Sequence, residues 1–452
     1  MLLGILLSVV TLVVYVPCLR GQFVFDDRLN LENNLPVRSI DGLGTIWFGA
    51  QTYDFYPVVN TVWWIEWHAW RKNTLPYHLV NVALHITNAL LIWRILLLLG
   101  VPGAWLAAMI FAVHPVNVSS VAWITELKNC LSLFVMLCTA IFYLDYRTRG
   151  KRAVYFLAIV AFLIGGLCKG TAVMLPFAML LYCLWKGFRR RDALDLLPFF
   201  VLGAAIAVAT VWFQQHNAIG ADIVRTDPFA ARLAGAGIAL WFYIGEAIWP
   251  AKVMIVHPIG EVGAPGIRSF LPLAGFLFMT AAAWRGRQVL GRGWTYAIAY
   301  FAIMLFPVLG FFNIYFMRFS IEADHWQYHA VIAVIATVVV LGIQILDRPS
   351  LRAAGIAGAT ICIALLAASS WRLAGTYQSR EIFWREALAQ NSDCWLACNN
   401  LAAELTELAR YREAEPYARR AVQMNPQSPQ SRNCLAEISR AIQAEESAVK
   451  AE

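Results

Sequence analysis

The sequence is poor in charge. Only 14% of its 452 residues are Asp, Glu, Lys or Arg, while 60% are apolar, and a soluble globular domain usually carries about 25% charged residues. A wholly water-soluble chain is therefore excluded. Apolar runs of about 17 to 23 residues recur along the chain, which is long enough for a helix to cross a hydrocarbon core of about 30 Å. We expect an all-α, multi-pass membrane protein.

The chain also lacks the paired cysteine spacing of a zinc site. Most of its nine cysteines lie inside apolar runs, where Cys behaves as a small hydrophobic side chain. Cys394, Cys398 and Cys434 lie near the C-terminus and could form a disulfide in an oxidising compartment, although the sequence does not say which two would pair. The net charge of +8 reflects the basic cytoplasmic loops of a multi-pass protein, so we expect no nucleic-acid partner.

Eleven runs predict membrane-spanning helices. The first, over 2–18, is followed by no small-residue cleavage site, so we expect a retained helix rather than a signal peptide. The others lie at about 78–99, 103–119, 129–145, 153–168, 170–186, 194–213, 270–284, 294–313, 329–346 and 353–370. A twelfth run, 231–249, is interrupted by glycines and Glu246, which suits an interfacial or re-entrant segment.

Loop charge decides whether the twelfth run spans. Short cytoplasmic loops are enriched in Lys and Arg, and all four basic loops fall on one side only if residues 231–249 do not cross. We therefore expect eleven spans, a cytoplasmic N-terminus, a long first outer loop over 20–76 and a C-terminal region on the outer face. The basic loops contain Arg147, Arg149, Lys151 and Arg152; Lys186, Arg189, Arg190 and Arg191; Arg285, Arg287 and Arg292; and Arg348 and Arg352.

The last 80 or so residues differ from the rest, because they are rich in charge and contain no spanning run. Comparing this region with itself shows a 34-residue period, which pairs Leu401 with Leu435 and Ala402 with Ala436. That period is typical of tetratricopeptide repeats. We expect four helices, near 377–390, 394–409, 411–424 and 428–443, and two domains, 1–370 and 371–452. The repeat region either binds a partner or serves as a docked C-terminal cap.

Two adjacent acids, Asp26 and Asp27, follow the first helix. Paired acids in this position are often solvated or cap a helix, but a carboxylate can also serve as a general base that accepts the proton of an acceptor hydroxyl. Adjacent aspartates could also hold a divalent metal. Both readings remain open. A lone cation, Lys169, lies in a tight turn, where it either extends to the interface or binds a membrane-embedded phosphate.

Polar and aromatic side chains recur at helical spacing in two other segments. His78, Asn81, His85 and Asn88 share one face of the second span, so they are either functional or interhelical hydrogen-bonding groups. Trp63, Trp67 and Trp70 form a stripe on a helix of the first outer loop. We expect this helix to lie in the headgroup layer, where the stripe anchors the loop or shapes a substrate site.

Several runs together resemble a known family. They are FVFDDRLNLENNLPV, FYPVVNTVWW, PYHLVNVALHITNALL, HPVNVSSVAWITELKNCLS, GLCKGTAVMLP and EADHWQYHA. Followed by tetratricopeptide repeats, they resemble the transmembrane-and-tetratricopeptide-repeat proteins and their bacterial relatives, members of the GT-C glycosyltransferase superfamily. The resemblance covers nearly the whole chain. It implies a GT-C-like membrane domain and a polyprenyl-phosphate sugar donor.

The resemblance also implies site residues. Asp26 and Asp27 match the catalytic acidic site and Lys169 the turn lysine, which would bind the donor phosphate together with Arg28 and His114. Apart from what the resemblance implies, we expect His78, Asn81, His85, Asp324 and His325 to form a supporting polar site. Asn117 and Ser119 stand where the family has His and Glu, and His325 stands where it has Arg.

The implied reaction transfers a sugar, mannose being one candidate, to a hydroxyl acceptor such as a protein Ser or Thr on the non-cytoplasmic face. The repeat region would hold a protein or glycan acceptor, and lipid is the other partner. The implied location is a bacterial inner membrane, or the endoplasmic reticulum membrane in a eukaryote. The alternative is a non-enzymatic, membrane-anchored adaptor of the cell envelope that keeps the GT-C-like fold as a scaffold.

Overall fold

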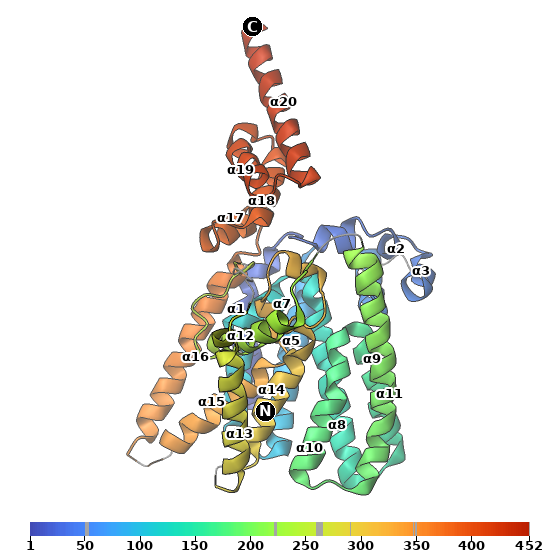
Figure 1. Ribbon diagram of the computed structural model, residues 1–452, viewed down its shortest axis with the longest axis vertical. Coiled ribbons are helices and arrows are strands. Elements are labelled where there is room, and N and C mark those ends of the chain that lie inside the picture. Colours follow the sequence, from blue (N-terminus) through green and yellow to red (C-terminus); the bar gives the residue numbers. More distant parts are fainter. Residues whose placement is uncertain are drawn as a thin grey trace.

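The computed structural model describes residues 1–49, 54–220, 224–258, 265–289, 291–346, 348 and 350–451. All regular secondary structure in these residues is helical, which confirms the all-α prediction. A bundle of long helices forms the body of the molecule, and the C-terminal helices project from one of its ends (Figure 1). We call that end the tail end of the bundle.

Twenty α-helices make up the fold. Their bounds are α1 (Leu2–Tyr15), α2 (Leu35–Arg38), α3 (Gly42–Phe48), α4 (Pro57–Trp70), α5 (Leu75–Leu99), α6 (Ala104–Ala112), α7 (Val118–Ala122), α8 (Leu127–Arg149), α9 (Arg152–Cys168), α10 (Leu175–Lys186), α11 (Arg190–Phe213), α12 (Phe229–Ile248), α13 (Leu271–Arg285), α14 (Gly293–Leu305), α15 (Val331–Leu346), α16 (Arg352–Gly375), α17 (Arg380–Gln390), α18 (Trp395–Glu407), α19 (Tyr411–Met424) and α20 (Pro429–Ala451), all within the described residues.

Local sequence explains where the long helices begin and end. Pro76 lies in the first turn of α5, where its missing N–H leaves no hydrogen bond unmade. The same helix ends at Gly100, whose φ of 76° is left-handed and therefore suits glycine. Helix α8 ends in the same way at Gly150, with a φ of 71°.

A helix lies at each of the eleven predicted spans. Among the described residues, six segments are long and apolar enough to cross a membrane: Leu2–Arg20, Leu75–Leu99, Ile124–Arg149, Arg190–Ile219, Ile267–Gln288 and Arg352–Gly375. The pair Ala104–Ala112 and Pro115–Ala122 qualifies together, with a bend of 54°. The remaining four are shorter apolar helices: Arg152–Cys168, Gly170–Lys186, Gly293–Val308 and Val331–Leu346.

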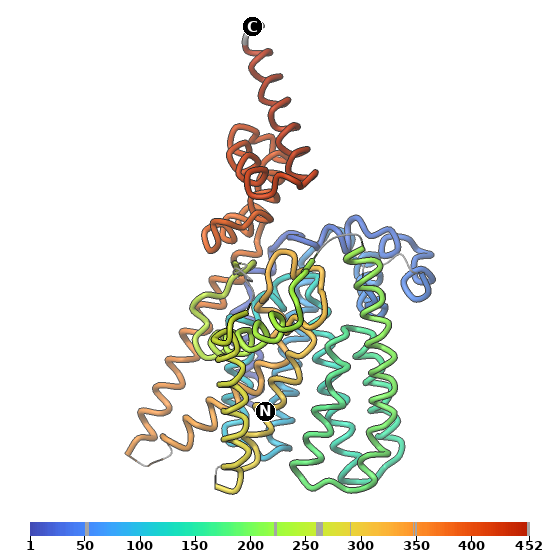
Figure 2. The backbone as a smooth tube through the Cα atoms, viewed as in Figure 1, coloured from blue at the N-terminus to red at the C-terminus, as the bar shows by residue number. Residues whose placement is uncertain are grey.

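The doubtful run forms α12, which is not among these segments and lies across the bundle instead of along it (Figure 2). The C-terminal ends of α8, α10 and α13 and the start of α16 all lie at the end of the bundle opposite the tail (Figure 1). These helix ends carry the predicted basic residues. We call this the basic end.

The tail helices begin within a few residues of the predicted positions, and three of the four also end there, while α20 extends further, to Ala451. All nine cysteines are free thiols, so Cys394, Cys398 and Cys434 form no disulfide in the structure. The tail packs against the bundle through side chains that belong to one continuous apolar core, among them Tyr377, Phe383 and Trp384.

The tryptophan stripe of α4 does not face lipid as a simple anchor would. Trp63 and Trp67 are buried in a core that includes Phe23 and Leu127, and the edge of Trp70 contacts Tyr77. The burial of Trp63 and Trp67 argues against the anchoring role of the stripe, while the position of α4 in the headgroup layer stays a prediction. The helical spacing of the stripe was right, but α2, α3 and α9 pack around α4 and cover this face.

Candidate active site

Charged side chains from four separate segments meet at the tail end of the bundle. They are Asp26 and Asp27 after α1, Asp54 before α4, Glu126 and Lys128 at the start of α8, and Lys169 between α9 and α10. We call these six residues the charged cluster. Charges removed from water interact strongly, so the pKa of each of these groups depends on its neighbours in the cluster.

Asp27 is fully buried, and both oxygens of its carboxyl group accept hydrogen bonds from the chain. Its Oδ2 accepts a hydrogen bond from the Val24 amide at 2.9 Å. Its Oδ1 accepts hydrogen bonds from the amide and the hydroxyl of Thr125, at 2.8 and 2.7 Å. Asp27 therefore ties the segment after α1 to the segment before α8. Burial and the neighbouring Asp26 raise the pKa of Asp27 to about 8.

Asp26 shares Thr125 with Asp27 but keeps part of its surface exposed. The Thr125 hydroxyl lies 2.7 Å from an oxygen of each carboxyl group. A hydroxyl has a single hydrogen, so Thr125 donates to one of the two carboxyl groups at a time. Burial raises the pKa of Asp26, and Lys128 opposes the rise. A raised pKa makes this carboxylate a stronger base than a solvated one.

The conformation of Phe25 fixes how Asp26 is presented. Phe25 has a φ of 47°, a left-handed value that costs a residue with a Cβ roughly 1–2 kcal/mol. Its ring is held by Trp123, at 5.1 Å between ring centres, and by Trp384 of the tail, at 5.3 Å. The tail thus contributes directly to the packing that holds the residue before the acid pair.

The two cations of the cluster are held by polar partners on α8. Lys128 Nζ lies 2.7 Å from Glu126 Oε1, and this glutamate is almost completely buried. Lys169 Nζ donates a hydrogen bond to Asn129 Oδ1. The Asn129 amide in turn donates to Glu126 Oε2. Lys169 therefore points into the cluster and is not extended along the interface.

His325 and Asp54 lie on two further sides of the charged cluster. His325 Nε2 lies 4.0 Å from Glu126 Oε1, and burial lowers the pKa of His325 to about 4, so the ring is neutral at pH 7. On another side, Asp54 accepts hydrogen bonds from Gln214 and Tyr56. Burial raises the pKa of Asp54, and Lys128 counters this rise.

Arg28 and His114 lie away from the cations of the cluster. Arg28 forms ion pairs with Glu32 at 3.2 Å and with Glu407 of α18 at 2.7 Å. His114 is buried, with its Nε2 3.1 Å from the carbonyl oxygen of Ala247. The structure therefore brings together only three of the five predicted catalytic and phosphate-binding residues: Asp26, Asp27 and Lys169.

The polar face of α5 joins helices together. Asn81 donates to the carbonyl oxygens of Val121, Trp123 and Ile124, at 3.2 to 3.3 Å. His85 bonds the Tyr328 hydroxyl at 2.8 Å and the Ala112 carbonyl at 3.0 Å. His78 is buried beside Gly21, where an added Cβ would meet its Nε2 at 3.0 Å. The contacts of Asn81 and His85 favour the interhelical hydrogen-bonding interpretation.

Asp324 belongs to a different group of contacts from His325. Its Oδ2 accepts a hydrogen bond from the Met254 amide at 2.9 Å and lies 3.2 Å from His257 Nε2. Burial lowers the pKa of His257, but Asp324 outweighs this and raises it overall. Asp324 thereby holds the segment after α12, whose Ile255 and Val256 backbones also bond to the tail.

Sequence reasoning missed Asp54, Glu126, Lys128 and Asn129. A signal for three of them was present, because charged and amide side chains at 126, 128 and 129 open an apolar span and must be paired inside the bundle. Asp54 carried no such signal, since an acid in a loop is usually solvated. Within the described residues, no three His, Cys, Asp or Glu side chains are grouped so that they could hold a metal ion.

Residues 57–213 match the family described as dolichyl-phosphate-mannose-protein mannosyltransferase. The chain resembles the O-mannosyltransferases. It is 28% identical over 158 residues to Protein O-mannosyl-transferase F38B6.6 of Caenorhabditis elegans, over 32% of this chain and 23% of that protein. It is 28% identical over 184 residues to Protein O-mannosyl-transferase Tmtc1 of Drosophila melanogaster, over 37% of this chain and 21% of that protein.

These similarities support the resemblance that the motifs indicated, to O-mannosyltransferases of the transmembrane-and-tetratricopeptide-repeat type. The chain spans only about a fifth of the length of each of these two relatives. The family match includes the wall of the site formed by Thr125, Glu126, Lys128, Asn129 and Lys169. It begins after the acid pair, so Asp26 and Asp27 are supported by geometry and motif alone.

Proposed function

We propose that this chain is a membrane glycosyltransferase that moves a sugar from a polyprenyl-phosphate donor to a hydroxyl acceptor. The similarity to protein O-mannosyltransferases favours mannose as the sugar and a protein as the acceptor. One observation carries the proposal: a partly exposed carboxylate of raised pKa lies in the same buried cluster as two cations. A base beside a phosphate-binding group is what this reaction needs.

Asp26 is the base in this proposal, and Asp27 is its positioning residue. Asp27 cannot approach a substrate, because it is buried and its oxygens are held by Val24 and Thr125. Asp26 would take the proton of the acceptor hydroxyl as the hydroxyl oxygen attacks the anomeric carbon. The bond between that carbon and the phosphate oxygen breaks, the electron pair leaves with the phosphate, and the configuration of the sugar inverts.

Lys169 and Lys128 would offset the charge that develops on the leaving phosphate. Both are held by α8 groups, Asn129 and Glu126, before any substrate arrives. Fixed charges in a site with little water stabilise a transition state without having to reorganise. In this proposal Lys128 and Lys169 take the phosphate-binding role that was expected of Lys169, Arg28 and His114.

The tail would present the acceptor in this proposal. Its helices repeat at the tetratricopeptide period, and α17 and α18 dock beside the acid pair through Trp384 and the Arg28–Glu407 ion pair. A protein bound to the tail would have its hydroxyl groups close to Asp26. The 1–370 and 371–452 division of the chain is part of the same proposal.

The test is transfer of radiolabelled sugar from polyprenyl-phosphate donors to an envelope extract by purified, full-length protein. Asp26→Asn should lower the rate by about 10²- to 10⁴-fold, which is the usual contribution of a general base. Asp41→Asn is the matched control, because Asp41 lies in the same loop and is exposed. Equal rates for wild type and Asp26→Asn would refute Asp26 as the base.

A second candidate function is the adaptor, and one observation favours it. The family's Arg is replaced by His325, whose ring is neutral inside the cluster that would hold the phosphate. An adaptor would transfer no sugar from any donor although well folded. A pull-down with full-length protein would then recover one dominant partner, lost when the tail is exchanged for an unrelated one.

A further inference from the structure

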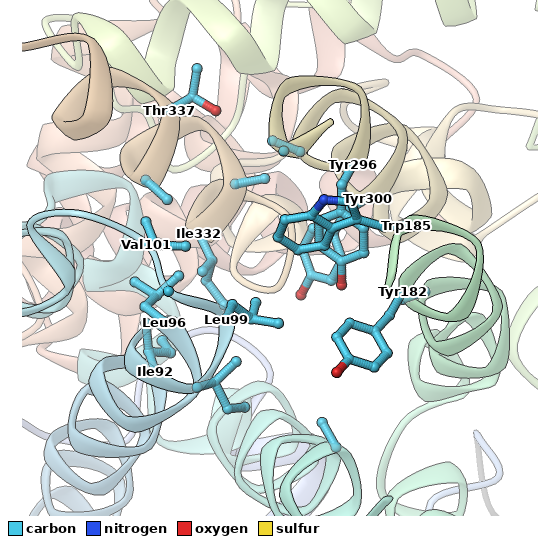
Figure 3. Close-up of a pocket in the computed structure, with 18 of the residues that line it drawn as sticks. Ile92, Leu96, Leu99, Val101, Tyr182, Trp185, Tyr296, Tyr300, Ile332 and Thr337 are labelled. Atoms are coloured by element: carbon cyan, nitrogen blue, oxygen red, sulfur yellow. The ribbon is translucent and has the colours of Figure 1, made fainter. Parts of the chain in front are cut away.

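A cavity of about 320 Å³ lies between α5, α8, α10, α14 and α15. Most of its lining is aliphatic, including Ile92, Leu96 and Ile332, whereas Tyr182, Trp185, Tyr296 and Tyr300 gather along one side (Figure 3). On α8 it extends from Leu133 to Leu144, a distance of about 17 Å along the helix at 1.5 Å per residue. A space of this shape and polarity suits a lipid chain.

The cavity is closed toward the charged cluster and open toward the basic end. The lining residues nearest the cluster, such as Leu133, Leu175 and Ala333, are buried. Those at the opposite end, Gly100, Pro102 and Gln344, are exposed. A lipid chain therefore enters this cavity from the basic end.

A hydrogen-bonded layer separates the cavity from the charged cluster. Ser132 Oγ lies 2.9 Å from His329 Nε2, and both side chains are buried. The Tyr300 hydroxyl donates to the His329 carbonyl oxygen at 3.1 Å. The chain of a donor whose phosphate lies at Lys169 would have to cross this layer, so the cavity is a poor continuation of the proposed donor site.

The open end carries positive charge beside aromatic rings. Lys186 Nζ lies 4.2 Å from the centre of the Trp185 ring, and Arg292 donates to the Trp185 carbonyl oxygen at 3.4 Å. Both side chains are exposed, and their polar contacts in the described part of the chain are with the ring and carbonyl of Trp185, not with a carboxylate. Trp and Tyr rings are typical of the level of lipid headgroups, and basic residues there attract anionic lipids.

We propose that this cavity binds one acyl chain of an anionic phospholipid that enters at the basic end, with its headgroup phosphate between Lys186 and Arg292. The apolar lining takes the chain, the aromatic rings mark the headgroup level, and the two cations select for negative charge. This site is separate from the charged cluster and does not depend on transferase activity.

Native mass spectrometry of the full-length protein in detergent tests this site directly. The probes are phosphatidylglycerol and phosphatidylcholine with identical chains, polyprenyl phosphate and inorganic phosphate. We expect phosphatidylglycerol to bind at least about tenfold more tightly than phosphatidylcholine, because each surface Lys or Arg favours anionic lipid. Inorganic phosphate should not displace it, since the chain supplies the rest of the affinity.

Two kinds of variant distinguish binding of the lipid headgroup from binding of the acyl chain. The double variant Lys186→Gln and Arg292→Gln should remove the preference for phosphatidylglycerol without disturbing packing. Lys151→Gln with Arg152→Gln is its control, because these exposed residues lie at the same end but do not line the cavity. Thr337→Trp should fill the cavity and abolish binding of both phospholipids.

Three results would overturn the proposal. Equal binding of the two phospholipids by wild type would remove the anionic selectivity. Unchanged binding by Thr337→Trp would place the lipid elsewhere. One-for-one displacement of phosphatidylglycerol by polyprenyl phosphate, lost again in Thr337→Trp, would assign the cavity to the donor chain.

Discussion

At the scale of single residues, the adjacent acids Asp26 and Asp27 differ in exposure and hydrogen bonding because their surroundings differ. Asp27 receives three hydrogen bonds from the chain, while Asp26 is partly exposed beside them. Their order in the sequence says nothing of this difference. It arises because Thr125, nearly one hundred positions away, offers both its amide and its hydroxyl to Asp27.

Asp27→Asn should lower stability more than Asp26→Asn does. An asparagine side chain must turn one NH₂ group toward the amide of Val24 or Thr125, so a hydrogen bond is lost and two donors face each other. The expected cost is about 1–3 kcal/mol. Thermal unfolding in detergent measures it. Equal melting temperatures for the two variants would contradict a positioning role for Asp27.

Glu66 should make stability depend on pH. It is almost fully buried on α4, and burial raises its pKa to about 8, against about 4.3 in an unfolded chain. Its contribution to stability is therefore full below about pH 4.3 and is lost as pH rises toward 8, by at most about 1.4 kcal/mol per pH unit.

The isosteric change Glu66→Gln should flatten the fall in melting temperature between pH 5 and 8. Asp27, with a pKa also raised to about 8, leaves a part of the slope in place. Glu445→Gln, an exchange at an exposed position of α20, is the control and should follow the wild-type curve. Parallel curves for wild type and Glu66→Gln would show that this carboxyl is not desolvated.

At the scale of elements, the tail helix α17 packs directly against the segment that carries the acid pair. Trp384 is buried and its ring contacts both Phe25 and Phe383. Main-chain bonds reinforce the junction, since the Gln22 amide donates to the Gln378 carbonyl oxygen at 3.1 Å. The strained backbone of Phe25 is thus held from the tail side by Trp384 as well as from the bundle side by Trp123, which follows α7.

Trp384→Ala should therefore loosen the tail and impair catalysis together. Truncating a buried Trp costs about 3–5 kcal/mol, so protease should cleave near residue 378 faster than in wild type. Transfer to a short hydroxyl acceptor that needs no repeat contact should show a lower kcat, because Phe25 and Asp26 lose their support. Trp371→Ala, an exposed tryptophan on α16, is the control. Full kcat in Trp384→Ala would mean that the tail acts only by binding the acceptor.

At the scale of the whole molecule, charge is sorted along the bundle. The four basic stretches lie at one end, and the charged cluster with the tail lies at the other (Figure 1). Since Lys and Arg near span ends are retained on the cytoplasmic side, we propose that the basic end is cytoplasmic. The site and the tail then face the outside of the cell or the lumen of the endoplasmic reticulum.

Labelling with a membrane-impermeant maleimide checks this orientation. In intact spheroplasts, Glu445→Cys on α20 should react at once, whereas Arg149→Cys at the end of α8 should react only after permeabilisation. The unsubstituted chain, with its native cysteines, gives the background. The reverse pattern would show that the protein has the opposite orientation in the membrane, which would place the proposed reaction in the cytoplasm.

The sequence by itself determined the local structure. Each predicted span contains a helix, because an apolar run of that length can cross a membrane only as a helix. The glycine-rich 231–249 run forms α12, which lies across the bundle. The shared face of His78, Asn81 and His85 followed from helical spacing alone. The same rule placed Trp63 and Trp67 together, though it could not say that α2, α3 and α9 would bury them.

Only the tertiary structure decided which distant groups meet. Lys128 and Asp54 belong to the charged cluster, whereas Arg28 forms an ion pair with Glu407 outside it. Both facts depend on how the folded chain brings together segments that are far apart in the sequence. The cavity between five helices likewise belongs to no single segment. Periodicity and hydropathy report how each helix meets its surroundings, whereas electrostatic partners depend on the three-dimensional path of the chain.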